Sequence, residues 1–190
     1  MSIQIKSTNL KNLIYNIPNF LEQIYIKKKK YSLLIYKNYI FNAISFFCKS
    51  TFFKLTTLTD LSAIDTMDTS YRYTVFYIVS SYQRNDRLEL QTKLKELQPI
   101  ESISRIFPAA SWLEREVWDM FGIFFINHPD LRRILTDYGF NGYPLRKDFP
   151  LSGYIEVRYD DTVKRVVSEK VELSQEFRIF DFKSPWEDSN

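Results

Sequence analysis

The chain has 190 residues, of which 45% are hydrophobic and 17% aromatic, and it carries a formal net charge of +3. This length and composition exclude a disordered chain and predict one folded domain, or one domain with an arm. One cysteine, one histidine and four glycines exclude an internal disulfide, a cysteine-rich zinc or iron–sulfur site, the P-loop and the dinucleotide-binding glycine motif. We therefore expect no cofactor and no metal on this chain.

Positive charge is concentrated at the amino end of the chain. Residues 1–54 contain nine lysines and a single acid, Glu22. Such a segment is compatible with nucleic acid, an anionic lipid surface, an acidic protein partner or a targeting peptide. The lysine run Lys27–Lys30 favours a solvated loop over a phosphate-binding site, because no nucleic-acid-binding motif accompanies it. A basic nucleic-acid-binding module using residues 1–54 remains the alternative function.

The first predicted elements are two helices with a strand between them. Apolar residues recur at helical spacing from Leu10 to Tyr25, with a kink or break at Pro18. After the Lys27–Lys30 connection, Tyr31–Tyr36 is a short apolar run that predicts a strand. Tyr39–Cys48 predicts a buried helix.

Four strands are predicted next, over residues 52–61, 71–81, 87–95 and 100–107. The second shows alternating apolar residues, as expected for a strand with one face on a core. The third ends before Pro99, and the fourth ends at Pro108.

The strongest helix signal follows Ser111. Ser111 and Glu114 have the spacing of a capping box, in which the hydroxyl and the carboxylate satisfy free amides at the helix start. Gly122 is placed to end the helix in the left-handed conformation. One face of this helix is apolar and carries Leu113, Val117, Met120 and Phe121.

Residues 128–190 have little periodicity and contain three of the four glycines. A short helix is predicted from Pro129 to Leu135, and a hairpin pairs residues 154–159 with 163–167. The rest has no core of its own but is rich in aromatic and arginine side chains, which are the residue types that anchor protein interfaces. We expect this stretch to be an arm laid over a partner.

Three carboxylates, Glu114, Glu116 and Asp119, invite a hydrolase or metal interpretation. On a helix Glu116 and Asp119 share a face, while Glu114 points away, and Arg115 is spaced to form an ion pair with Asp119. We favour a helix cap and ion pairs over catalysis. His128 is expected to cap, pack or form hydrogen bonds, and Cys48 to be an inert buried thiol.

Several long motifs closely resemble one known family. They are W-L-E-R-E-V-W-D-M-F-G-I from Trp112, H-P-D-L-R-R-I-L-T-D-Y-G-F-N-G-Y-P-L-R-K-D-F-P-L-S-G-Y from His128, E-V-R-Y-D-D over 156–161, Q-E-F-R over 175–178 and S-P-W-E over 184–187. This pattern resembles the 30-kilodalton-type subunit of respiratory NADH:ubiquinone oxidoreductase, complex I. The sequence departs from the family pattern at Tyr143, where the family usually has histidine, and at Lys170, where it usually has proline.

The resemblance implies an α+β fold: a two-layer domain with a mixed, mainly antiparallel sheet and helices on one side. The domain would span residues 1–127, and an extended arm with little regular structure would span 128–190, with a hairpin at 154–167. It also implies a non-catalytic core subunit of the peripheral arm that scaffolds the quinone module.

The implied partners are the 49-kilodalton-type quinone-site subunit and the neighbouring cluster-bearing subunits. The implied location is the matrix side of the mitochondrial inner membrane, and the composition hints at a mitochondrial gene. No catalytic, cofactor-binding or metal-binding residue is expected. The expected partner interface consists of Arg132, Arg133, Tyr138, Phe140, Arg146, Lys147, Asp148, Phe149, Arg158, Tyr159, Phe177, Arg178, Phe180 and Trp186.

Overall fold

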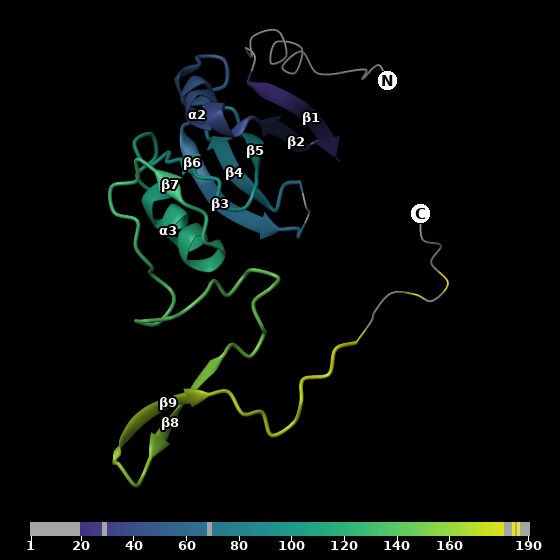
Figure 1. The fold of residues 1–190 in the computed structure, drawn as a ribbon. Helices are drawn as coiled ribbons and strands as arrows, with labels where there is room; N and C mark the ends of the chain where they lie inside the picture. Colours follow the sequence, from purple (N-terminus) through teal and green to yellow (C-terminus); the bar gives the residue numbers. More distant parts are fainter. Residues whose placement is uncertain (1–19, 28–29, 68–69, 181–183, 185, 187–190) are drawn as a thin grey trace. The chain divides into compact units, whose positions relative to one another are not determined.

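The computed structural model describes residues 20–27, 30–67, 70–180, 184 and 186 (Figure 1). The chain divides into two compact units, residues 1–149 and residues 150–190. The stretch 128–149, which the sequence assigned to the arm, thus belongs to the first unit by its contacts.

The first unit is built on a five-stranded sheet with the strand order β1-β2-β5-β4-β3. Strands β2 and β5 are parallel, and the other neighbouring strands are antiparallel. The mixed, mainly antiparallel sheet predicted for an α+β fold is therefore confirmed. Its strands are β1 (Leu21–Lys27), β2 (Lys30–Ile35), β3 (Thr57–Asp65), β4 (Tyr73–Ser81) and β5 (Asp86–Leu94).

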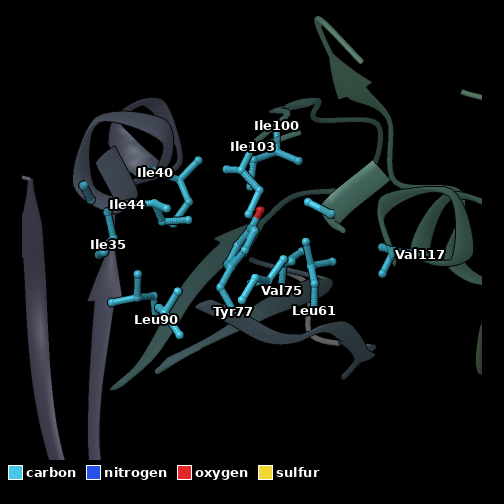
Figure 2. Packing of buried hydrophobic residues seen from close by; sticks show 14 of the residues in the cluster. Ile35, Ile40, Ile44, Leu61, Val75, Tyr77, Leu90, Ile100, Ile103 and Val117 are labelled. Carbon is cyan, nitrogen blue, oxygen red and sulfur yellow. The ribbon is translucent and has the colours of Figure 1, made fainter. Parts of the chain in front are cut away.

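Two helices cover one face of this sheet. They are α2 (Ile40–Lys49), which follows the 3₁₀ turn η1 (Lys37–Tyr39), and α3 (Ala110–Phe121). Alternate residues of β4 are buried along its whole length, and they join a single core cluster with residues of both helices. Figure 2 shows the β4 residues Val75 and Tyr77 in this core, with Tyr77 pointing toward Ile100 and Ile103. All four side chains are at most 1% exposed.

Three of the strand predictions, 31–36, 71–81 and 87–95, correspond to β2, β4 and β5. The strand predicted over 52–61 begins later, at Thr57, because residues 51–53 form a turn. There Phe53 packs edge-on against Phe47 of α2, with ring centroids 5.2 Å apart. Aromatic packing on the helix therefore takes these residues out of the sheet.

The strand predicted over 100–107 is wrong beyond Glu101. Only β6 (Ile100–Glu101) forms, and it pairs in parallel with β7 (Phe125–Ile126). The amides of Ile106 and Phe107 both donate to the carbonyl of Ile103. The chain therefore turns at Ile103, and its buried residues follow the spacing of that turn rather than the alternation of a strand.

The helix predicted over 10–25 is wrong in its described part. Residues 10–19 lie outside the described residues, but Leu21–Lys27 forms β1, which pairs antiparallel with β2. The same apolar residues that fit a helix here satisfy a strand, and pairing with β2 decides between them. Lys27 and Lys30 are the last partners of the hairpin.

The predicted end of helix α3 is correct, but its predicted start is wrong. Its N-cap is Ala109, which makes no side-chain cap bond, so the capping box of Ser111 and Glu114 is wrong. Ser111 lies inside the helix, and the Glu114 carboxylate instead accepts hydrogen bonds from residues 102 and 103. The predicted stop is confirmed: Gly122 has a φ of 74° in the left-handed region.

The short helix predicted from Pro129 to Leu135 does not form. Residues 127–149 contain no helix or strand. The amides of Ile134, Leu135 and Thr136, at the end of the predicted helix, bond to the Asp119 side chain and not to carbonyls one helical turn earlier.

The second unit contains an antiparallel hairpin of β8 (Ile155–Asp160) and β9 (Arg165–Lys170). The predicted hairpin is thus present, with its turn over residues 161–164 rather than 160–162. Most of its residues are exposed, and none is buried.

Two glycines test how closely residues 127–149 pack on α3. Gly122→Ala is expected to lower the free energy of unfolding by more than Gly139→Ala, because both positions have a positive φ but only one is crowded. A Cβ at Gly122 would lie 2.5 Å from an Arg146 nitrogen, whereas a Cβ at Gly139 would meet nothing within 4 Å. We expect a loss of about 1 kcal/mol at Gly139 and at least about 2 kcal/mol at Gly122, measured by urea denaturation. Equal losses would contradict the close packing.

Candidate partner-binding site

The predicted interface residues fall into two groups, with Lys147 between them. Arg133, Phe140, Arg146, Asp148 and Phe149 contact other side chains of the first unit. Another group is exposed and consists of Arg132, Tyr138, Arg158, Tyr159, Phe177, Arg178, Phe180 and Trp186. Lys147 is exposed but donates its backbone amide to Asp65 at 2.9 Å.

A buried carboxylate on α3, Asp119, anchors the part of residues 127–149 around Arg133. Its Oδ2 accepts hydrogen bonds from the amides of Ile134, Leu135 and Thr136 at 3.1, 2.7 and 2.9 Å. Its Oδ1 accepts from the Thr136 hydroxyl at 2.6 Å and lies 3.3 Å from Arg133 Nη1. The predicted pair of Arg115 with Asp119 is therefore wrong, because Arg115 donates instead to the carbonyl of Arg132 at 3.0 Å.

These contacts control the protonation of Asp119. Burial raises the pKa of the carboxyl, but the Thr136 hydroxyl and the three amides outweigh it, so the pKa lies below its ordinary value. Asp119 is consequently a buried anion that orders a segment without secondary structure.

A stack of arginine and aromatic side chains lies beside this anchor. The guanidinium carbons of Arg133 and Arg146 lie 5.0 and 4.3 Å from the centroid of the Tyr143 ring. The Tyr143 ring is also edge-on to Trp118 of α3 at 5.8 Å. Each guanidinium is attracted to the electron-rich face of the ring, so the stack fastens residues 133–146 to the helix.

A second anchor, which we call the Arg72 hub, joins three loops at one end of the sheet. Arg72 lies 3.1 Å from Asp65, 2.9 Å from Glu96 and 2.9 Å from Asp148. Arg146 also lies 3.8 Å from Glu96 and donates to the carbonyl of Phe121 at 2.6 Å.

The charges of the Arg72 hub reinforce one another. Burial raises the pKa of Asp65, but hydrogen bonds from Arg72 and from the amides of Lys147 and Met67 outweigh it and leave the pKa low. The Asp65 carboxylate, opposed by burial, in turn holds the pKa of Arg72 above its usual range. Both groups stay ionised at neutral pH, so the hub fixes the segment that leads to the second unit.

The hairpin of the second unit has two chemically distinct faces. Directly paired residues of β8 and β9 share a face. The register therefore places four apolar side chains on one face, together with Ser168 and Lys170 at one end: Ile155, Val157, Tyr159 and Val166. These side chains are 54–64% exposed. The other face carries the paired charges, with Arg158 Nη2 2.7 Å from Glu169.

The buried Glu114 lies near His128. The carboxylate accepts from the Ser102 hydroxyl at 2.6 Å and from the Ile103 amide at 2.7 Å, and His128 Nε2 lies 3.7 Å away. His128 Nδ1 accepts from the Asp130 amide at 3.1 Å, so Nε2 carries the proton and donates to the Ser111 carbonyl at 3.2 Å. His128 thus forms hydrogen bonds, as expected from the sequence.

The three carboxylates of α3 do not form one site. Glu114 and Asp119 are buried and occupied by separate sets of hydrogen bonds, whereas Glu116 is exposed. This geometry is that of structural anchors and does not resemble a pair of carboxylates facing a substrate.

Comparison with known families identifies the family of this chain. A family model described as the respiratory-chain NADH dehydrogenase, 30 Kd subunit, matches residues 33–155. The chain belongs to this family.

Relatives of the same kind are found in plants. A chain of Patellifolia webbiana named NADH dehydrogenase (ubiquinone) iron-sulfur protein 3 is 56% identical over 153 residues, which are 80% of each chain. A chain of the same name from Arabidopsis thaliana is 55% identical over 150 residues, which are 79% of each chain. The resemblance read from the motifs is therefore confirmed.

Two solved structures share the fold at 20% identity. A trypsin-resistant fragment of Nqo5 is matched over its whole length and over 65% of this chain, with a TM-score of 0.54. A chain of the membrane-bound sulfane sulfur reductase, an archaeal respiratory membrane complex, is matched with a TM-score of 0.64 over 75% of this chain and 84% of its own.

The relatives are named as iron-sulfur proteins, but the residues of this chain do not fit an iron–sulfur cluster. Iron–sulfur clusters are typically held by four cysteine thiolates, and this chain contains one cysteine. Cys48 is partly buried in α2 against the core. Within the described ranges, no group of three or more His, Cys, Asp or Glu side chains could hold a metal ion.

The sequence did not indicate which residues of the domain anchor residues 127–149. Asp65 ends β3, Arg72 precedes β4 and Glu96 follows β5, and nothing local marks them as partners of residues 146–148. Helical spacing placed Asp119 on the same face as Glu116, which is exposed, so the sequence did not indicate that Asp119 is buried.

Asp119→Asn is expected to lower the free energy of unfolding at pH 7 by about 2–4 kcal/mol, because an amide nitrogen cannot accept the hydrogen bonds made to Oδ2. Urea denaturation of the full chain measures this loss. The control is Glu116→Gln on the exposed face of the same helix, with an expected change within about 0.5 kcal/mol. Because the Asp119 pKa is lowered in the folded state, the difference should shrink as the pH falls below about 4.

The contribution of Glu114 to stability should depend on pH in the opposite direction from that of Asp119. Burial, opposed by hydrogen bonds from Ser102 and Ile103, raises its pKa to about 7, so the folded chain holds a proton that the unfolded chain releases near pH 4–5. Stability should therefore fall by up to about 3 kcal/mol as the pH rises through this window. Glu114→Gln should remove this part of the slope between pH 5 and pH 7, measured by urea denaturation at each pH. Parallel profiles of the two chains, which share His128, would contradict the assignment.

Proposed function

We propose that the chain is a non-catalytic core subunit of the peripheral arm of NADH:ubiquinone oxidoreductase. In this proposal it scaffolds the quinone module while the assembly transfers electrons from NADH to ubiquinone and translocates protons. Membership of the 30-kilodalton-subunit family supports the assignment to this complex.

The β8–β9 hairpin is the main support for the proposal that the chain functions by binding a neighbouring subunit. An isolated two-stranded hairpin is marginally stable in water, and this hairpin has no buried residue in its own unit. Its apolar face is largely exposed, which is typical of a surface that another protein covers. The paired charges on the opposite face fit a hairpin whose second face stays in water or at a polar rim.

The residues beyond the hairpin support the same function. Phe177, Phe180 and Trp186 are 57%, 58% and 91% exposed, and Arg178 lies over the Phe180 ring at 5.2 Å. Aromatic and arginine side chains supply much of the binding energy of protein interfaces. We therefore assign the predicted interface residues of the second unit to contacts with other subunits.

The proposed neighbours are the 49-kilodalton-type quinone-site subunit and adjacent cluster-bearing subunits. The proposed location is the matrix side of the mitochondrial inner membrane, with the gene in the mitochondrial genome. Among the described residues, no helix has the length and apolar character needed to span a bilayer. Contact with other subunits would then attach the chain to the membrane.

The proposed mechanism is mechanical. Electron transfer depends on the separation and orientation of redox centres, and these centres belong to the neighbouring chains. Asp119 and the Arg72 hub hold residues 127–149 in one conformation, so the first unit can act as a fixed spacer between the surfaces that it contacts.

The nucleic-acid-binding alternative finds no support. The family model, the curated relatives and the solved structures reported above all belong to respiratory enzymes.

A matched pair of valines tests the role of the hairpin. Val157 lies on the apolar face, whereas Val167 is paired with Arg158 on the charged face. We expect Val157→Asn to reduce incorporation into the complex about tenfold, because it places an amide in a desolvated contact, whereas Val167→Asn should reduce it by less than about twofold. Native electrophoresis of membranes that carry each full-length variant measures incorporation.

The stability of the two isolated variants provides the control, because both lose the same side chain from the same hairpin. Equal incorporation of both variants would remove the support for binding through the apolar face. Failure of the unaltered chain to enter the complex would remove the proposed function itself.

A further inference from the structure

A hollow opens on the first unit where the chain enters α3. Its volume is about 430 Å³, and six residues line it: Ser104, Arg105, Pro108, Ser111, Asn127 and Pro129. The first four belong to the stretch that leads from β6 into α3, and the last two follow β7. We call this feature the α3 hollow. None of its lining residues takes part in the interface proposed above.

Hydrogen bonds hold the walls of the α3 hollow in place. The Ser104 hydroxyl lies 2.8 Å from the Ser102 hydroxyl, which donates to the buried Glu114 of α3 at 2.6 Å. On the other side His128 Nε2 donates to the Ser111 carbonyl at 3.2 Å. The segments before α3 and after β7 are thus both tied to the same helix, and their lining residues form one surface.

The α3 hollow is chemically suited to an anionic group. Arg105 is the one charged residue that lines it. In the part of the chain that the structure describes, the side chains of Arg105 and Asn127 make no ion pair and no hydrogen bond. Of the nearby carboxylates, Asp130 is paired with Arg132 at 2.9 Å, and Glu114 is completely buried. The first turn of α3, which contains no acidic residue, adds partial positive charge.

Apolar and aromatic groups at the α3 hollow favour a protein side chain over a free ion. Pro108 and Pro129 give it apolar walls. Trp112, which follows the lining residue Ser111, is 65% exposed. The Arg115 guanidinium lies 5.3 Å from the centroid of the Trp112 ring and donates to a backbone carbonyl at 3.0 Å, so the ring has a fixed neighbour. An exposed tryptophan beside an arginine is typical of residues that anchor protein interfaces.

We infer that the α3 hollow receives a carboxylate side chain from an acidic segment of a neighbouring subunit, with Arg105 as its ion-pair partner and Trp112 packed beside that segment. This inference rests on the proposed function. Charge complementarity supports this occupant, because the Arg105 guanidinium lacks a carboxylate partner among the described residues of its own chain. A second copy that presented the same hollow would bring two Arg105 side chains together, which is unfavourable.

Arg105→Gln tests the ion pair. Incorporation into the complex should fall about tenfold, because the carboxylate of the neighbour is left unpaired in the contact. Native electrophoresis of membranes that carry the full-length variant measures incorporation. The isolated variant should unfold at the same urea concentration as the unaltered chain, because the change removes no ion pair from the described domain. Arg105→Lys keeps the charge without the planar fork and should lose less incorporation than Arg105→Gln.

The matched control is Arg87→Gln at the start of β5. Arg87 is also an exposed arginine without an ion pair in the described part of the chain, so incorporation should change by less than about twofold. A similar loss for Arg87→Gln and Arg105→Gln would overturn the inference. Undiminished incorporation of Arg105→Gln, or equal losses for Arg105→Gln and Arg105→Lys, would overturn it as well.

Photo-crosslinking identifies the occupant. Benzoylphenylalanine replacing Pro108 should crosslink, in the assembled complex, to a segment of another subunit that contains aspartate or glutamate. Arg105→Glu should reduce incorporation, and replacing the carboxylate of the crosslinked segment by arginine should restore it. The inference is wrong if position 108 crosslinks to a second copy of this chain, to its own residues 150–190, to lipid or to a segment without a carboxylate.

The outcomes distinguish this inference from the proposed function. If Val157→Asn impairs incorporation and Arg105→Gln does not, the assignment of the α3 hollow fails while the proposed function stands. If the unaltered chain does not enter the complex, both fail.

Discussion

A buried carboxylate on α3 determines the conformation of the longest irregular segment in the first unit. Asp119 collects three backbone amides, one hydroxyl and one guanidinium from residues 133–136. Without this acceptor those amides would be unpaired against the helix, and each unpaired group costs free energy when buried. Asp65 plays the same part farther along, where it accepts the Lys147 amide. Carboxylates of the domain therefore order this segment together with the few backbone hydrogen bonds of its own turns.

This arrangement limits what sequence patterns can predict. Periodicity located α2, β4 and β5 because each element buries one face on the common core. Gly122 and the hairpin could be predicted because turn chemistry is local. Those signals depend only on neighbours in the chain, and they carried most of the fold.

The wrong predictions concern residues whose partners are distant in the sequence. Residues 21–25 were predicted as the end of a helix because their apolar residues fit that spacing, but pairing with β2 makes them part of a strand. Glu114 has the spacing of a helix cap, yet its partners Ser102 and Ile103 precede the helix by a turn. The partners of Asp119 and Arg72 are set by the tertiary fold alone. Within the candidate site, residue types that are typical of protein interfaces were recognisable, whereas the division between anchoring and exposed side chains required coordinates.

The parallel pairing of β2 with β5 bears on how the chain is made. Ser32 pairs with Glu89, and the two residues are 57 positions apart. A chain emerging from the ribosome at 5–20 residues per second therefore exposes the β1–β2 hairpin for several seconds before its sheet partner exists. Contacts of such long range also slow folding after synthesis is complete. Until β5 has been made, β2 lacks its parallel partner, and the core residues of α2 lack part of the sheet that they cover in the folded chain.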